Sequence, residues 1–186
     1  LFYAAAGVSN SGAVHIIDIQ TATEVRRIDN PNPTANANFG GPVSAGTNDV
    51  YRTNSIAISG DKVVIGSPKD GFGKVYIFDM VSGVLEHTID SSTTPSIATA
   101  VDGDHRFGAN IVASGDFAVV SKMSHTYVIE ISTGQVVFEN SSLNTQSVSI
   151  TGNTLVGGYT GGSFHSAGFN YGGYDNGVAE VRYMKP

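Results

Sequence analysis

The sequence predicts an all-β fold, and two regularities carry this prediction. Apolar and polar residues alternate with a period of two, and β-branched and aromatic residues fill the apolar positions, as in Val75-Tyr76-Ile77-Phe78. The 23 glycines and the prolines interrupt this pattern at intervals of about 8–12 residues, which is the spacing of short antiparallel strands. No helical pattern of useful length accompanies it, so we expect strands joined by turns.

Length and composition suit one domain of modest size with a neutral, polar surface. The chain has 186 residues, of which 40% are hydrophobic and only 14% are charged, against about 25% charged residues in an ordinary soluble domain. Serine, threonine, asparagine and glycine fill the surface instead, which favours an extracellular or particle-borne protein. The net charge of −6 and the scattered basic residues argue against a nucleic-acid partner. The sequence contains no run of about 18 apolar residues, the length that a membrane-spanning helix needs. The absence of cysteine excludes disulfides and thiolate metal sites.

A unit of four short apolar stretches recurs along the chain in a constant order. The clearest copies are residues 55–89 and 107–139, each with a Ser-Gly-Asp turn after its first stretch and a Thr-Gly or Ser-Gly turn before its last. The predicted strands are residues 1–6, 13–19 and 24–28 in the first unit; 54–59, 62–67, 74–80 and 84–89 in the second; 108–114, 117–122, 126–131 and 135–139 in the third; and 147–151, 154–159 and 178–184 in the fourth.

The first turn of the second, third and fourth units contains Gly-Asp or Gly-Asn. These pairs are Gly60-Asp61, Gly115-Asp116 and Gly152-Asn153. A two-residue hairpin turn needs positive φ values that these residue types adopt at the least cost. We therefore expect Asp61, Asp116 and Asn153 to form turns and not to have a catalytic role.

Four antiparallel strands in each of several adjacent units are the blades of a β-propeller. We expect residues 1–186 to form a single propeller domain or a fragment of one. It would contain a partial blade at 1–29, a surface insert at 30–53, blades at 54–90 and 107–140, and a partial blade at 146–186. Because neither terminal blade is complete, we expect the native polypeptide to continue beyond both ends; a small four-bladed ring is the alternative.

Several motifs resemble the FG-GAP type of β-propeller repeat. The second unit reads SIAISGD at 55–61, VVIGSP at 63–68 and GKVYIF at 73–78, and the third contains Phe107-Gly108 followed by IVASGDFAVV at 111–120. Phe39-Gly40 precedes the second unit. The strands entered through Thr-Gly turns are also similar to quinoprotein-like propeller repeats. The resemblance covers nearly the whole chain. It implies a binding or scaffolding role, as in surface proteins, adhesion receptors and phage structural proteins, more than catalysis.

The integrin-type version of this repeat carries a calcium loop of alternating acids. The nearest match in this chain is Asp102-Gly103-Asp104, which supplies two carboxylates where calcium takes about six to eight oxygen ligands. We therefore expect no cofactor, with a calcium ion at Asp102 and Asp104 as the alternative.

No pattern of catalytic residues is visible. The sequence contains no H-E-x-x-H or G-x-S-x-G motif, and the loop at residues 66–71 is not followed by the Lys-Ser or Lys-Thr pair that a phosphate-binding loop requires. Tryptophan is absent, although sialidase-like propellers carry it in their repeated boxes and quinoprotein dehydrogenases stack their cofactor on it. The sequence therefore favours a protein that is not an enzyme.

The long insertion at residues 157–177 is the predicted contact surface. Insertions in repeat proteins form loops on one face, which is often the binding face. Aromatic residues alternate here with glycine, a composition that suits contact with a protein neighbour or a sugar; the alternative is that the aromatic residues fold onto their own blade. The candidate contact residues are Tyr159, Phe164, His165, Phe169, Tyr171 and Tyr174.

These observations favour a non-enzymatic structural or adhesion module on a cell surface or a viral particle such as a phage. Its expected partners are protein neighbours in an assembly or surface glycans, without nucleic acid or a membrane span. Two alternatives stay open. The chain could be a carbohydrate-binding or sensor domain of a larger extracellular enzyme, or itself a propeller lyase or hydrolase.

Overall fold

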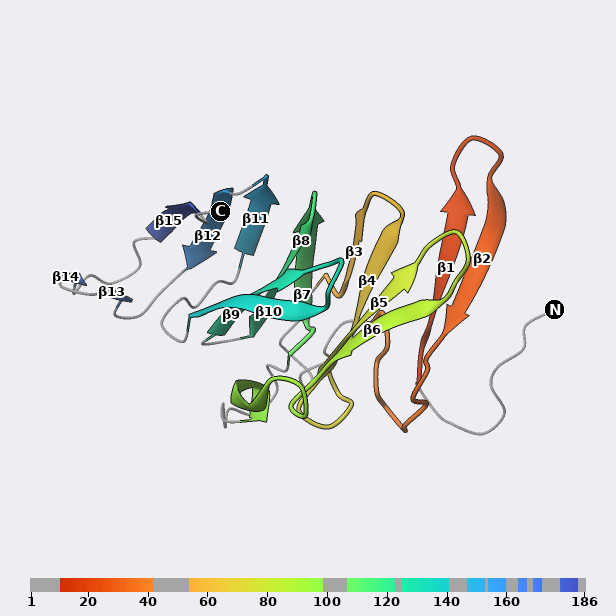
Figure 1. Cartoon of the computed structure of the whole chain (residues 1–186), viewed down its shortest axis with the longest axis horizontal. Coiled ribbons are helices and arrows are strands. Elements are labelled where there is room, and N and C mark those ends of the chain that lie inside the picture. Colours follow the sequence, from red (N-terminus) through yellow and green to blue (C-terminus); the bar gives the residue numbers. More distant parts are fainter. Residues whose placement is uncertain are drawn as a thin grey trace, which may run out of the picture.

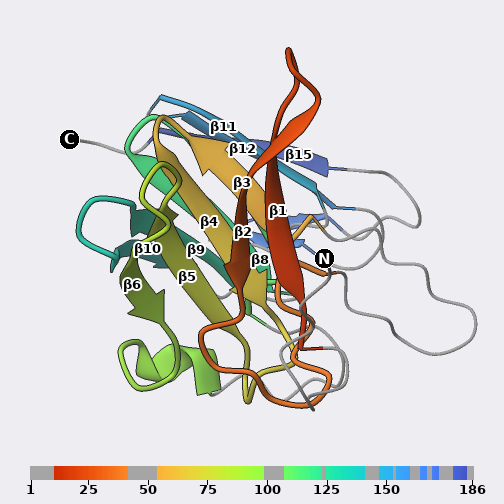
Figure 2. The ribbon, with the colours of Figure 1, turned by 90° about the vertical axis from the view of Figure 1, so that its right-hand side faces the viewer.

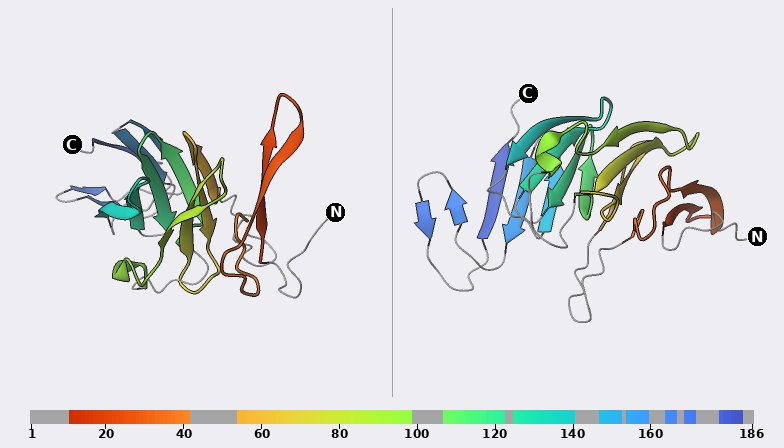
Figure 3. Two further views of the ribbon diagram at one scale, coloured as in Figure 1. Left: turned by 45° about the vertical axis from the view of Figure 1, so that its right-hand side comes forward. Right: turned by 90° about the horizontal axis from the view of Figure 1, so that it is seen from below.

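The computed structural model of this chain describes residues 11–41, 54–98, 107–122, 125–140, 147–152, 154–159, 164–166, 169–171 and 178–183. Its larger sheets follow one another in chain order along an arc (Figures 1 and 3), and we call them blades. The first blade contains β1 (Ala13–Asp18) and β2 (Thr23–Asp29); the second β3 (Ile56–Ser59), β4 (Lys62–Ser67), β5 (Lys74–Asp79) and β6 (Leu85–Ile89); the third β7 (Asn110–Ser114), β8 (Phe117–Lys122), β9 (His125–Glu130) and β10 (Gln135–Asn140); the fourth β11 (Ser147–Thr151), β12 (Thr154–Tyr159) and β15 (Val178–Tyr183).

The all-β prediction and the four-stranded antiparallel sheets are confirmed. The second and third sheets have the strand orders β3-β4-β5-β6 and β10-β9-β8-β7, so sequence neighbours pair throughout. The predicted strand at residues 1–6 lies outside the described residues. The short 3-10 helix η1 (Pro95–Ala98) that follows β6 was not predicted, nor were two short strands within the 157–177 insertion.

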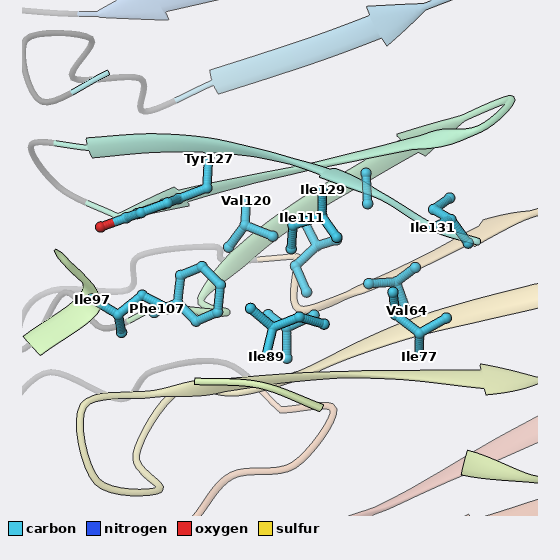
Figure 4. Packing of buried hydrophobic residues seen from close by; sticks show 12 residues of the cluster. Val64, Ile77, Ile89, Ile97, Phe107, Ile111, Val120, Tyr127, Ile129 and Ile131 are labelled. Atoms are coloured by element: carbon cyan, nitrogen blue, oxygen red, sulfur yellow. The ribbon is translucent and has the colours of Figure 1, made fainter. Parts of the chain in front are cut away.

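The central strands of each complete blade are buried on both faces, which explains their almost continuous apolar runs. In the second blade, Val64 and Ile77 pack toward the third blade, while Val63 and Phe78 pack toward the first. A blade of this kind cannot bury both faces alone, so its neighbours complete its core. Figure 4 shows the interface between the second and third blades, where Phe107 and Tyr127 lie close to Ile97 of η1.

A phenylalanine lies at the start of each of these interfaces. The ring of Phe39 packs edge-on against Tyr76 at a centroid distance of 5.7 Å, and Phe107 packs edge-on against Tyr127 at 5.2 Å. Both phenylalanines are almost fully buried. The Phe-Gly pairs noted in the sequence therefore occupy equivalent structural positions.

The predicted hairpin turns form with glycine in the left-handed region. Gly60 has a φ of 60°, and Gly115 a φ of 58°. Neither Asp61 nor Asp116 is among the described non-glycine residues with positive φ, which are Ala22, Asn36 and Asn38. Glycine at the first central position alone is the arrangement of a type II′ turn, so the aspartates contribute to the turns without a positive φ.

The last strand of each of the first three blades contains a β-bulge at the same place. The extra residues are Val25 in β2, Glu86 in β6 and Val137 in β10. A bulge bends the strand and increases its twist, which limits pairing of an exposed edge with another chain. It also re-aims the next side chain, which is Arg26, His87 or Phe138.

The structure modifies the predictions for both insertions. The described part of the 30–53 insert is not confined to the surface, because Ala37 and Phe39 are buried in the first interface. The 157–177 insertion is not simply a loop. It contains β13 (Phe164–Ser166) and β14 (Phe169–Tyr171), which pair as a two-stranded antiparallel sheet.

Candidate binding groove

A groove of about 860 Å³ separates the outer edges of the second and third blades. One side is formed by β6, the other by β10, and residues of the segment that includes η1 complete the lining. Figure 2 shows η1 beyond the lower end of β6. We call this space the outer groove. Its hydroxyl-bearing lining residues are Thr88, Thr93, Thr94, Ser96 and Thr133.

One end of the outer groove is bridged by His87. This side chain follows the bulge of β6, and its Nε2 donates a hydrogen bond of 3.0 Å to the carbonyl oxygen of Ser132 in the β9–β10 turn. Gly134 packs against the imidazole, since an added β-carbon there would lie 2.7 Å from the His87 side chain. The histidine therefore joins the two blades, as expected for a structural residue.

The same bridge occurs between the first and second blades with a different side chain. Arg26 occupies in β2 the place of His87 in β6, and its guanidinium donates to the carbonyl oxygen of Val81 in the β5–β6 turn. Gly83 lies against this arginine in the way that Gly134 lies against His87. The bridge is thus a repeated inter-blade contact.

The other end of the outer groove is bridged by Ser96 and Glu139. The Ser96 hydroxyl donates a 2.8 Å hydrogen bond to Oε2 of Glu139, which joins the η1 segment to β10. Beneath it, the buried ammonium of Lys122 donates to the carbonyl oxygen of Ile97 at 2.8 Å. Burial also raises the pKa of Tyr127, with a smaller contribution from the negative charge of Glu139. The η1 segment is therefore fixed from two sides.

Both walls of the outer groove are sheet edges. β6 and β10 are each the last strand of their sheet, so each has a row of backbone N–H and C=O groups that no further strand of its sheet pairs. On β10, exposed and half-buried residues alternate, and Val137 is 50% exposed while Val136 packs against the core. The groove therefore offers backbone groups, hydroxyls and a small apolar surface, which are the means of binding an extended molecule.

The predicted aromatic contact residues fall on the fourth blade and the small sheet beside it. Tyr159 ends β12 and pairs with Val178, while Phe164 pairs with Tyr171, His165 with Asn170, and Ser166 with Phe169. Four of the six candidates therefore share one hairpin. Tyr174 lies outside the described residues.

The described residues contain no group of three or more histidines, aspartates or glutamates placed to hold a metal ion. Asp102 and Asp104 lie outside the described residues, so the calcium alternative stays a prediction. In the part of the chain that the structure describes, no helix is long and apolar enough to cross a membrane.

The outer groove was not anticipated from the sequence. Its bridging residues, His87, Ser96, Ser132 and Glu139, come from two repeat units and from a connection with no repeat pattern. One signal was present: the second unit has His87 where a strand of the first has Arg26, both just after the same turn. Only the register of the bulged strands shows that these positions are equivalent.

Comparison with known proteins bears on the fold alone. No protein-family model matches the chain, and no curated protein matches it. Among solved structures, it is similar to the Pan2 WD40 domain of Neurospora crassa, with a TM-score of 0.50, 9% identity, and coverage of 92% of this chain and 43% of that one. It also aligns with BamB from Moraxella catarrhalis, with a TM-score of 0.48, 17% identity, and coverage of 81% and 38%.

This chain spans less than half the length of these two structures. The similarity to the WD40 domain, together with the four-stranded sheets, supports the β-propeller class. It does not distinguish the FG-GAP type, which stays a prediction.

Proposed function

We propose that this chain is a non-enzymatic propeller module that binds a protein partner, and that the outer groove is where the partner engages. The observation that carries the proposal is the groove itself, whose two walls are sheet edges and whose two ends are bridged by His87 and by the Ser96–Glu139 pair. Such a site is held in shape before a partner arrives, which lowers the entropy cost of binding.

We further propose that the protein acts outside the cell, on a cell surface or a viral particle. The support is compositional: only 14% of residues are charged, and neutral hydrogen-bonding residues take their place. The resemblance to FG-GAP repeats points the same way. Fractionation of the native source tests this assignment, and recovery of the protein only with the soluble intracellular fraction contradicts it.

The aromatic hairpin β13–β14 is a second candidate contact surface, favoured by four aromatic or histidine residues within six strand positions. It suits an adhesive contact with a surface glycan or a neighbouring protein. Deletion of residues 161–176 is expected to weaken such attachment and leave the melting temperature of the blades unchanged. Unchanged attachment excludes the hairpin.

The two alternative functions can be told apart by different measurements. A carbohydrate-binding or sensor domain of a larger enzyme requires a catalytic domain elsewhere in the same polypeptide, which the intact mass of the native protein detects. A propeller lyase or hydrolase requires turnover of a polysaccharide by this chain. A broad polysaccharide screen without turnover excludes the last of these.

Site-specific photo-crosslinking tests the proposed function. The crosslinking residue p-benzoylphenylalanine replaces Val137, which lines the outer groove, or Ile58, a control of similar exposure outside the lining; the two side chains are 50% and 56% exposed. After irradiation in native material, we expect one protein adduct from position 137 and none from position 58, with the partner identified by mass spectrometry. Equal labelling from both positions, or none from position 137, contradicts the proposal.

A further inference from the structure

We infer that the partner segment bound in the outer groove is an extended peptide with a lysine or arginine side chain that pairs with Glu139. This inference rests on the proposed function and specifies its ligand. Both the charge and the shape of the groove support it.

Among the described residues that line the outer groove, Glu139 is the one carboxylate, and none is a lysine or an arginine. Its side chain is exposed and receives a single described hydrogen bond, from Ser96 to Oε2. A carboxylate has about four lone-pair positions, so this bond uses only part of its capacity. Among the described ion pairs, none involves Glu139, and the ammonium of Lys122 binds the Ile97 carbonyl instead.

A peptide cation in the groove therefore meets a carboxylate that forms no described ion pair, and the described lining contains no lysine or arginine that would repel it. The overall net charge of −6 acts in the same direction and speeds the approach of a basic segment. An acidic segment would meet repulsion from both.

The shape of the groove favours an extended peptide. Its walls, β6 and β10, expose backbone groups, and the hydroxyls of Thr88 and Thr94 supply further donors and acceptors along it. The bulges at Glu86 and Val137 leave only the ends of the two strands regular. A bound peptide therefore pairs with few backbone groups of these strands. Its specificity depends on side-chain contacts. The ring of Phe138 packs toward the fourth blade, which argues against a glycan stacked on it.

Selection from a library of short random peptides tests this inference. The full chain is immobilised, the enriched peptides are sequenced, and the binding face is mapped by the amide shifts of the groove residues on titration. We expect lysine or arginine at one fixed position, with shifts at residues 135–139. The Glu139→Gln variant should lower the affinity about three- to fivefold at about 50 mM salt and not measurably at about 500 mM, since an exposed pair is weak and screened.

The matched control is Asp116→Asn, which makes the same change of charge in the β7–β8 turn, outside the groove lining. It should leave the affinity within twofold of the wild type. An equal loss in both variants overturns the inference, because the effect would then be one of net charge. Peptides that bind the groove without a basic residue overturn it and leave the proposed function intact.

Three further outcomes overturn the inference, and they differ in what they mean for the proposed function. A glycan that binds the groove in a parallel array, with shifts at the same residues, overturns both. A photo-crosslinked protein partner together with a failure to select any peptide overturns the extended-peptide inference alone. Basic peptides whose shifts map outside residues 87–96 and 132–139 overturn it as well.

Discussion

The carbonyl oxygen of Phe107 lies 2.1 Å from the position that a β-carbon on Gly73 would occupy. The backbone that leads into the third blade therefore rests directly on the backbone of the second. Phe39 stands in the same relation to Gly12, at 2.2 Å. The glycine before the third strand of one unit and the Phe-Gly pair of the next are therefore two halves of a single inter-blade contact.

Replacement of Gly73 by alanine tests this contact. The added methyl group forces the two backbones apart, and Gly73 also has a φ of 96°, which disfavours any side chain. Together these effects should lower the free energy of unfolding by about 3 kcal/mol. Gly71→Ala is the matched control, because Gly71 has a φ of 62° but nothing within 4 Å of an added β-carbon. It should cost about 1 kcal/mol in urea unfolding, and equal costs for the two variants would contradict the contact.

The β1–β2 turn offers a stabilising substitution. Ala22 has a φ of 54° at the position that Gly83 and Gly134 occupy in the next two blades. A left-handed conformation costs an alanine about 1–2 kcal/mol, whereas a new glycine loses about 0.4–1 kcal/mol through the unfolded chain. Ala22→Gly is therefore expected to stabilise the protein by about 0.5–1 kcal/mol in urea unfolding. Gly83→Ala should destabilise it, and a loss of stability in Ala22→Gly would show that the turn tolerates alanine without strain.

The strands and first turns could be predicted because their signals are local. Period-two alternation and Gly-Asp pairs act over a few residues, and β3 to β12 begin and end within about two residues of the predicted bounds. The bulges at Val25, Glu86 and Val137 could not be predicted, since one unpaired residue in an exposed strand leaves the apolar pattern almost unchanged.

The candidate sites likewise differ in whether a local sequence signal marks them. The aromatic hairpin could be located because its unusual composition is continuous in the sequence, although its two strands could not be told from a loop. The outer groove depends on which unit follows which in space. His87 and Glu139 are distant in sequence, and only the packing of the second blade against the third places them at two ends of one groove.

The His87 bridge predicts that arginine is the substitution best tolerated there. His87→Ala removes the hydrogen bond to the Ser132 carbonyl and should cost about 1 kcal/mol of stability. His87→Arg should retain most of it, because Arg26 makes the equivalent contact with Val81. Amide hydrogen exchange at Thr133–Gln135 reports the bridge directly, and it should speed up in the alanine variant only. Identical exchange and stability in both variants would show that the side chain acts merely as a spacer.

The acid stability of the protein should depend on Asp79. Hydrogen bonds from the backbone and hydroxyl of Ser82 and from Lys62 hold the pKa of this carboxyl far below its ordinary value of 3.8. Because the folded state binds the proton less readily than the unfolded state, Asp79 stabilises the fold above about pH 4, and this contribution is lost as the pH falls through the lower folded value. Glu86 and Asp79 in turn raise the pKa of Lys62 above its ordinary value of 10.5. The contribution of Lys62 to the stability of the fold is therefore fully present below about pH 10.5 and is lost in more alkaline solution.

The measurement is the melting temperature of the wild type and of Asp79→Asn from neutral to acid pH. The variant should melt below the wild type at neutral pH, and the difference should shrink progressively below about pH 4. Ser82→Ala is expected to lower the melting temperature by less and with the same dependence on pH, because the backbone N–H of residue 82 still donates to the carboxylate. These side chains are accessible to solvent, so the Lys62 part of the difference should also shrink in high salt. A difference that stays constant down to about pH 2 would mean that the asparagine preserves the turn without needing the charge.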